Sequence, residues 1–240
     1  MIFELILDIT KLALIVAGLY VAFGAYVRRR RQAWSEPMVK RRFAILLALV
    51  LVVSAIKVSE DVLGGESGPI DMAILVFIHN HVPNAWTGFF EVVTLTGSVR
   101  VLVPLTVAGT IALLFARRRL EAWLLAASVI VGEILVYLVK TVVGRVRPEL
   151  WERESYWGSS FPSGHTLIVA AFATAVVLCV DRIRPSAHGF ALSMALFWIS
   201  TVALSRLVLG VHWPTDVLAA ACIGAMLPLA ISVALEFRGA

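Results

Sequence analysis

Residues 159–172 read SSFPSGHTLIVAAF, a short polar turn that leads directly into an apolar run. Pro162 and Gly164 are typical of a turn, and Ser163 is typical of the residue that caps the start of a helix. None of these explanations accounts for His165, which stands where the chain enters apolar surroundings. The meaning of the turn therefore depends on what those surroundings are.

The composition indicates a membrane protein. The chain has 240 residues, of which 60% are hydrophobic and 15% are charged, and its mean hydropathy is +0.91. A soluble domain is about half apolar and about a quarter charged. The net charge of +5 does not by itself indicate nucleic acid, because the basic residues gather in short loops. Cys179 and Cys222 lie in apolar runs, so we expect buried free thiols.

Apolar runs of membrane-spanning length recur along the chain. A transmembrane helix needs roughly 17 to 25 mostly apolar residues. Seven runs qualify, at about 5–27, 43–63, 97–116, 120–140, 165–181, 190–209 and 215–236. The predicted fold is an all-α, polytopic membrane helix bundle. Its six-span core covers residues 43–240, and residues 1–42 add one N-terminal span and a basic cytoplasmic loop.

The segment 64–95 does not fit this pattern. Glycine and proline interrupt it too often for a clean span. It is predicted to be a loop that carries a short interfacial helix, with Trp86, Phe89 and Phe90 at the depth of the lipid headgroups.

The basic residues predict the orientation in the membrane. They follow the first, third and fifth spans, at 28–31 and 40–42, at 117–119, and at Arg182 and Arg184. Lysine and arginine are enriched in cytoplasmic loops. The N-terminus is therefore expected outside and the C-terminus inside a cell membrane, with a bacterial inner membrane as the expected setting.

Three polar clusters then lie on the outer, periplasmic or extracellular, face. They are KTVVGRVRP at 140–148, PSGH at 162–165 and SRLVLGVHWPTD at 205–216. Any one of them is explained by basic side chains that snorkel toward the headgroups. Three together, on the side that should be poor in basic residues, indicate a site.

The cationic residues of these clusters suit a phosphate group. Lys140, Arg147 and Arg206 offer three positive charges and many hydrogen-bond donors. Ser163 opens a helix, whose N-terminus attracts anions, and Gly164 lets the backbone approach an oxyanion closely.

The histidines suit phosphoryl transfer. His212 lies just before a helix that begins at Pro214, and Asp216 falls in the first turn of that helix. A carboxylate there can hold one imidazole nitrogen and leave the other free as a nucleophile. His165 would then protonate the leaving oxygen.

These three clusters resemble the three motifs of the type-2 phosphatidic acid phosphatases. Lys140 is followed by Arg147-Pro148, then Pro162-Ser163-Gly164-His165, then Ser205-Arg206, His212 and Asp216, at matching spacings. The resemblance implies that His212 forms a phosphohistidine, Asp216 orients it and His165 is the acid. It also implies the phosphate-binding set Lys140, Arg147, Ser163, Gly164 and Arg206, with no metal and no cofactor.

The implied function is the hydrolysis of a phosphate from a membrane lipid at the outer face. Undecaprenyl pyrophosphate, phosphatidylglycerol phosphate, phosphatidate and lipid A are candidate substrates. Lipid phosphotransfer and a soluble sugar phosphate are alternative activities, and a non-catalytic carrier or scaffold is an alternative from another class. The headgroup, the oligomeric state and the role of the first span do not follow from the sequence.

Some charged residues near the motifs have no assigned role. Lys57 and Asp61 are four apart on one span and are expected to pair, with a role at the lipid entrance as the alternative. Glu133 lies two turns before Lys140 on the same helical face, and we expect it to support Lys140 or a neighbouring helix. Arg145 fits snorkelling and contact with a substrate headgroup equally well.

Overall fold

The protein is all-helical in the parts that the computed structural model describes, residues 2–148 and 158–238. The predicted fold class is therefore confirmed. The helices are α1 (Ile2–Arg30), α2 (Ser35–Lys40), α3 (Arg42–Leu63), α4 (Gly68–His81), α5 (Thr87–Thr96), α6 (Val99–Phe115), α7 (Arg119–Val143), α8 (Gly164–Ile183), α9 (His188–Val208) and α10 (Pro214–Arg238). Short 3-10 turns lie at Gln32–Trp34, Asn84–Trp86 and Pro185–Ala187.

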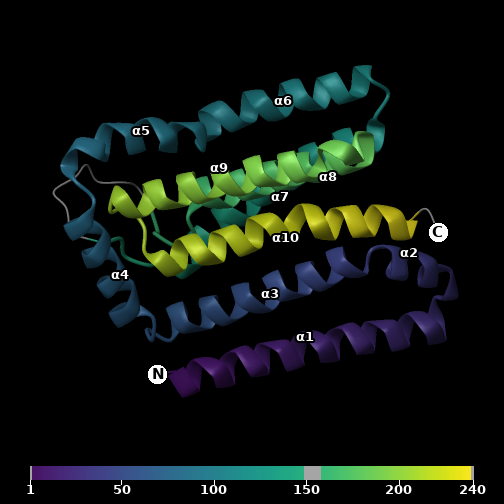
Figure 1. The fold of residues 1–240 in the computed structure, drawn as a ribbon, viewed down its shortest axis with the longest axis horizontal. Helices are drawn as coiled ribbons and strands as arrows, with labels where there is room; N and C mark the ends of the chain where they lie inside the picture. Colours follow the sequence, from purple (N-terminus) through teal and green to yellow (C-terminus); the bar gives the residue numbers. More distant parts are fainter. Residues whose placement is uncertain (1, 149–157, 239–240) are drawn as a thin grey trace.

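The long helices lie side by side, and α4 lies across one end of them (Figure 1). Within the described residues, seven helical stretches are long and apolar enough to cross a membrane, as predicted. A helix satisfies all of its internal backbone hydrogen bonds within one segment, which an apolar environment requires. The chain is thus a multi-pass membrane protein.

The segment 64–95 differs from the prediction. It forms the helices α4 and α5, and α5 joins α6 in a single apolar stretch from Asn84 to Phe115. Phe90 is not available to the lipid headgroups, because it is buried against Val208, Leu209 and Val211. Trp86 and Phe89 are about half exposed, at 53% and 51%, and their interfacial position stays a prediction.

A close approach at Gly97 sets the join between α5 and α6. A side-chain Cβ there would lie 2.8 Å from a methyl group of Val202 and 3.0 Å from one of Val169. Glycine therefore allows this junction to press against α8 and α9. The end of α5 is held beside the ends of the helices that carry the polar clusters.

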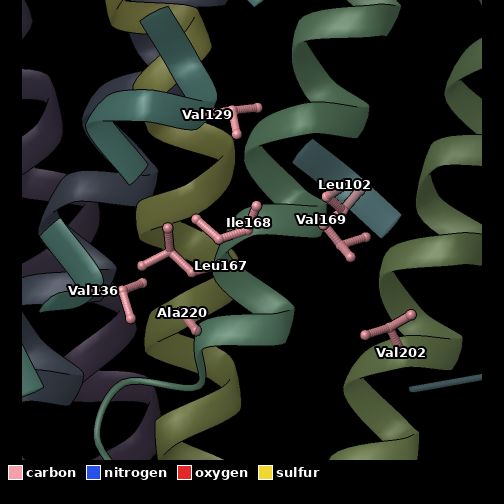
Figure 2. Close-up of a cluster of buried hydrophobic side chains, with 8 residues drawn as sticks. All are labelled: Leu102, Val129, Val136, Leu167, Ile168, Val169, Val202 and Ala220. Carbon is pink, nitrogen blue, oxygen red and sulfur yellow. The ribbon is translucent and has the colours of Figure 1, made fainter. Parts of the chain in front are cut away.

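The core is built around α8 and α10. Of the most apolar part of α8, 56% is buried within the protein, against 11% for α1 and for α3. Figure 2 shows side chains from five helices that meet around α8. They are Leu102, Val129, Val136, Leu167, Ile168, Val169, Val202 and Ala220. This packing fixes the relative depths of α7, α8, α9 and α10.

Residues from the first forty pack against α3 and α10. Val27, Met38 and Ile45 form a small apolar cluster that Phe237 also joins. Nearby, Arg41 and Arg182 both pair with Glu236. These contacts tie the chain before α3 to the last turns of α10, at the end of the bundle away from α4 (Figure 1).

Candidate active site

The three polar clusters meet at the end of the bundle that α4 covers (Figure 1). The sequence ends or begins a helix at each of them. α7 ends where Gly144 adopts a left-handed conformation with φ of 62°, a position that favours glycine. α8 follows Ser163, and α10 begins at Pro214, since proline suits the first position of a helix.

The first cluster is hydrogen-bonded to Ser159 and Ser160, which come just before the second cluster. The amide of Ser160 donates to the carbonyl of Arg145 at 2.8 Å, and the amide of Arg145 donates to Ser159 Oγ at 2.9 Å. The carbonyl of Ser159 accepts from Lys140 Nζ at 2.5 Å and from Arg147 Nη2 at 3.5 Å. These bonds place the ends of the lysine and the arginine side chains next to each other.

The third cluster holds a histidine–aspartate pair that is closed to solvent. His212 is 2% exposed and Asp216 is fully buried. His212 Nδ1 lies 3.5 Å from Asp216 Oδ2, which also accepts from the amide of Trp213 at 2.9 Å. The histidine–aspartate distance is longer than a normal hydrogen bond, but the nearby carboxylate still favours the neutral tautomer that carries its proton on Nδ1 and a lone pair on Nε2.

That second nitrogen faces an arginine. His212 Nε2 lies 3.4 Å from Arg147 Nη1, and the same Nη1 donates to the carbonyl of Val211 at 2.7 Å. Burial lowers the pKa of His212 to about 4, and Arg206 and Arg147 add to this effect, although the hydrogen bond to Asp216 acts in the opposite sense. The imidazole is therefore neutral at pH 7, as a nucleophile must be.

The remaining predicted residues surround this pair. Arg206 is 2% exposed, and its Nη1 donates to Thr94 Oγ1 at 2.6 Å. His165 lies in the first turn of α8, within electrostatic range of Arg206, His212, Lys140 and Arg147.

The start of α8 lies next to the start of α10. The amide of Ser163 donates to the carbonyl of Asp216 at 3.3 Å, and Ser163 Oγ lies 3.1 Å from Thr166 Oγ1. Gly164 follows as the first residue of α8. The structure thus brings all eight predicted site residues to one place.

Two contributors were not predicted from the sequence. Thr94 of α5 holds Arg206, and Asp71 of α4 contacts Arg145 and Thr215 beside the histidine–aspartate pair. An acid two residues after Pro69, in the first turn of a mostly apolar helix, was a signal for Asp71. Thr94 had no such signal, because threonine is common on the packed face of a membrane helix.

The structure shows the contacts of the charged residues to which the sequence assigned no role. Lys57 and Asp61 form the expected pair, with Nζ 2.7 Å from Oδ1. The guanidinium of Arg145 points into the protein, where it forms ion pairs with Asp71 and Asp216. Glu133 was expected to support Lys140 or a neighbouring helix. Lys140 donates to the carbonyl of Ser159 instead, and among the described residues Glu133 Oε1 has no hydrogen-bond partner.

Phosphate-sized anions suit this arrangement of groups. Three cations, a helix N-terminus and a neutral histidine whose Nε2 faces Arg147 converge at one end of the bundle. Among the described residues, no group of three His, Cys, Asp or Glu side chains is placed to hold a metal ion. The fold and the candidate site together define a membrane helix bundle with a candidate anion site at one end.

Comparison with known proteins agrees with this class. Residues 121–239, about half of the chain, match the model of the PAP2 superfamily. The chain belongs to this superfamily. The matched region contains all eight predicted site residues.

Relatives align over very different lengths. Phosphatidylglycerophosphatase B of Escherichia coli K12 is 38% identical over 73 residues, which are 30% of this chain and 27% of that protein. The alignment thus spans about a quarter of that relative. An undecaprenyl-diphosphatase of Sulfolobus acidocaldarius is 26% identical over 209 residues, covering 84% of this chain and 95% of that one.

A solved structure shares the fold. It is a transmembrane PAP2-type phosphatidylglycerolphosphate phosphatase from Bacillus subtilis, with a TM-score of 0.65 and 23% identity. It covers 83% of this chain and 96% of its own.

Proposed function

We propose that the protein is a lipid phosphatase that hydrolyses a phosphate monoester or diphosphate through a phosphohistidine on His212. The observation that carries this proposal is the placement of the imidazole. Nδ1 lies against a buried carboxylate, and Nε2 lies 3.4 Å from Arg147, within the group of cations.

In the first step, His212 Nε2 attacks phosphorus and the bond to the leaving oxygen breaks. His165 gives a proton to that oxygen, so the leaving group departs as an alcohol or as a lower phosphate. In the second step His165 takes a proton from water, the water oxygen attacks the phosphohistidine, and inorganic phosphate is released.

The remaining residues bind the transferring group. Lys140, Arg147 and Arg206 face the phosphate oxygens, whose negative charge spreads during transfer. Ser163 and the amides that follow it at the start of α8 add donors and a positive helix end. Asp216 stabilises the positive charge that develops on His212. In this scheme the cationic side chains take the place of a metal ion.

A lipid substrate fits the position of the site. It lies at the end of the spans that α4 covers, where α4, α5 and the turn between them expose apolar side chains, among them Ile70, Phe77, Trp86 and Phe89. A tail held in the bilayer can bring a phosphate to this depth. The names of the relatives, a phosphatidylglycerophosphatase and an undecaprenyl-diphosphatase, support this substrate class.

Purified protein will therefore release phosphate from a panel of lipids that contains phosphatidylglycerol phosphate, undecaprenyl pyrophosphate, phosphatidate and lipid A. Vanadate will inhibit it, because vanadate adopts the five-coordinate geometry of the transition state, and a chelator will leave the rate unchanged. Activity that a chelator removes and magnesium or zinc restores would overturn the metal-free scheme. Release from a soluble sugar phosphate alone, or transfer to a lipid hydroxyl in place of water, would redirect the assignment.

We also propose that residues 43–240 are the catalytic core, that residues 1–42 are an addition to it, and that the site faces the periplasm or the cell exterior. The basic residues at 28–31, 40–42 and 117–119 belong to the end of the bundle away from α4. Lysine and arginine favour the cytoplasmic side.

Single cysteines test this orientation, in a background where Cys179 and Cys222 are replaced by alanine. Glu66 and Gln32 are both exposed, the first between α3 and α4 at the site end and the second beside α2 at the opposite end. A membrane-impermeant thiol reagent added to intact cells will label Glu66→Cys and spare Gln32→Cys. The reverse pattern would place the site in the cytoplasm and remove outer-leaflet lipids from the substrates.

A further inference from the structure

A second set of buried charged groups contacts Asp216 of the histidine–aspartate pair. Asp71, on α4, is fully buried, and its Oδ2 lies 2.7 Å from Arg145 Nη2. The other terminal nitrogen of Arg145, Nη1, lies 2.5 Å from Asp216 Oδ1. One guanidinium thus bridges two carboxylates that come from positions 145 residues apart in the chain.

The two carboxylates are also linked through the start of α10. The amide of Thr215 donates to Asp71 Oδ1 at 2.9 Å, and its hydroxyl donates to Asp71 Oδ2 at 2.6 Å. Arg145 Nη1 in turn donates to this hydroxyl at 2.9 Å. Asp71 therefore accepts hydrogen bonds at both oxygens, and it supplies α10 with a cap from another helix.

This cap suits the N-terminus of α10. The first amides of a helix have no partner within the helix, and a negative charge is favourable beside them. The residue before α10 is Trp213, whose side chain carries no oxygen acceptor, and its indole N–H donates to Val146. Asp71 caps this helix in place of a serine or aspartate at the N-cap position.

The bridge fixes Asp216 from the side away from the histidine. Oδ2 of Asp216 is engaged by His212 and by the amide of Trp213, while Oδ1 is engaged by Arg145. A buried carboxylate without a cationic partner is costly, and one that is free to rotate does not select the imidazole tautomer. Arg145 supplies the cationic partner of Asp216 and restricts the rotation of its carboxylate. Asp71 in turn holds Arg145 in place.

We infer that Asp71 and Arg145 are positioning residues that hold His212 in its reactive orientation, through Asp216 and through the start of α10. The inference rests on the proposed function, since it concerns the nucleophile of that reaction. Neither residue touches the phosphate in this scheme. Their loss should lower kcat and leave KM almost unchanged, because the cations that bind the substrate stay in place.

The direct test compares Asp71→Asn, Arg145→Lys and the double variant. Asparagine keeps one acceptor oxygen but directs an amide toward the guanidinium. Lysine keeps the charge but lacks the two separate terminal nitrogens with which Arg145 reaches Asp216 and Asp71. Each single change should lower kcat roughly 10- to 100-fold with KM within about two-fold, and the double variant should be no worse than the poorer single one, since both act through one chain of contacts. Asp8→Asn is the control, because Asp8 is an exposed acid paired with Lys11 on α1.

A second measurement does not depend on turnover. In protein labelled with ¹⁵N-histidine, nitrogen spectra distinguish a protonated ring nitrogen from one that bears a lone pair, and His212→Gln identifies the His212 signals. The wild type and Asp8→Asn will show a single tautomer with the proton on Nδ1, whereas Asp71→Asn and Arg145→Lys will show a mixture.

The outcomes separate the two claims. An unchanged kcat or an unchanged tautomer in both single variants, or a rise of KM at constant kcat, would refute the positioning role and leave the phosphatase function intact. A wild type that releases no phosphate from any lipid would refute the function, and the spectra would still decide the positioning role. If Asp71→Asn does not fold, Arg145→Lys, which retains a charge beside Asp216, decides it.

Discussion

His212→Gln will release no phosphate above background, a loss of at least about 10⁴-fold. Glutamine matches the imidazole in polarity and approximate size, but its amide nitrogen is not a nucleophile. Because His212 Nε2 is the atom that attacks phosphorus in the proposed reaction, no other group in the site replaces it. The measurement is the rate of phosphate release in detergent, with the preferred lipid at saturation.

The control for this loss is His188→Gln. His188 lies at the start of α9, and its side chain is 43% exposed beside Asp181, at the opposite end of the helix from Arg206. This variant should retain full activity. His212→Gln should keep the elution profile and the helical circular dichroism of the wild type, and a variant that is folded yet retains more than a few per cent of activity would remove His212 from the role of nucleophile.

The second large effect concerns His165, and it depends on the leaving group. General acid catalysis contributes about 10²- to 10⁴-fold, so His165→Asn should lose activity in that range on a lipid phosphate, whose alcohol leaves poorly without a proton. A nitrophenyl phosphate has a leaving group that needs no proton. With this substrate the first step should proceed at nearly the rate of the wild type.

The second step still needs a base for the water molecule. His165→Asn should therefore show a burst of nitrophenol equal to the amount of enzyme, followed by slow turnover, which is the mark of a covalent intermediate that accumulates. Equal losses on the two substrates, with no burst, would show that His165 binds phosphate and does not transfer protons.

The sequence could bring the candidate site residues to one face because helix ends are a local property. Once the spans alternate across the membrane, Lys140, His165 and His212 must all lie on the same face, whatever the packing of the helices. Asp71 and Thr94 could not be predicted in this way. Their roles depend on how α4 crosses the bundle and how closely α5 approaches α9, and the spacing of residues along the chain carries no information on either.

The segment 64–95 shows the same limit. Its glycines and prolines made it resemble a loop, yet within an apolar environment the backbone must satisfy its own hydrogen bonds. It therefore forms helices, with one break at Val82-Pro83 inside the segment. A second break, at Gly97-Ser98, comes just after it. Gly97 is a break in the helix and also the point where a side chain would collide with Val202, and only the tertiary packing shows the second role.

Arg145 illustrates a choice that the sequence left open. A basic residue two positions before Arg147 fits either the lipid headgroups or the substrate, and its spacing favours neither. In the structure its charge is directed inward by Asp71 and Asp216, two acids from distant helices. One of these two partners, Asp71, lies outside the three motifs.

The most direct test of the account is to trap the intermediate. Purified protein is mixed for milliseconds with a lipid whose terminal phosphate carries ³²P, then quenched, digested and examined by mass spectrometry. The account predicts an acid-labile, alkali-stable phosphate on the peptide that contains His212, formed before free phosphate appears and absent from His212→Gln. Turnover without any such label on a rapid time scale, or label on another residue, would contradict it.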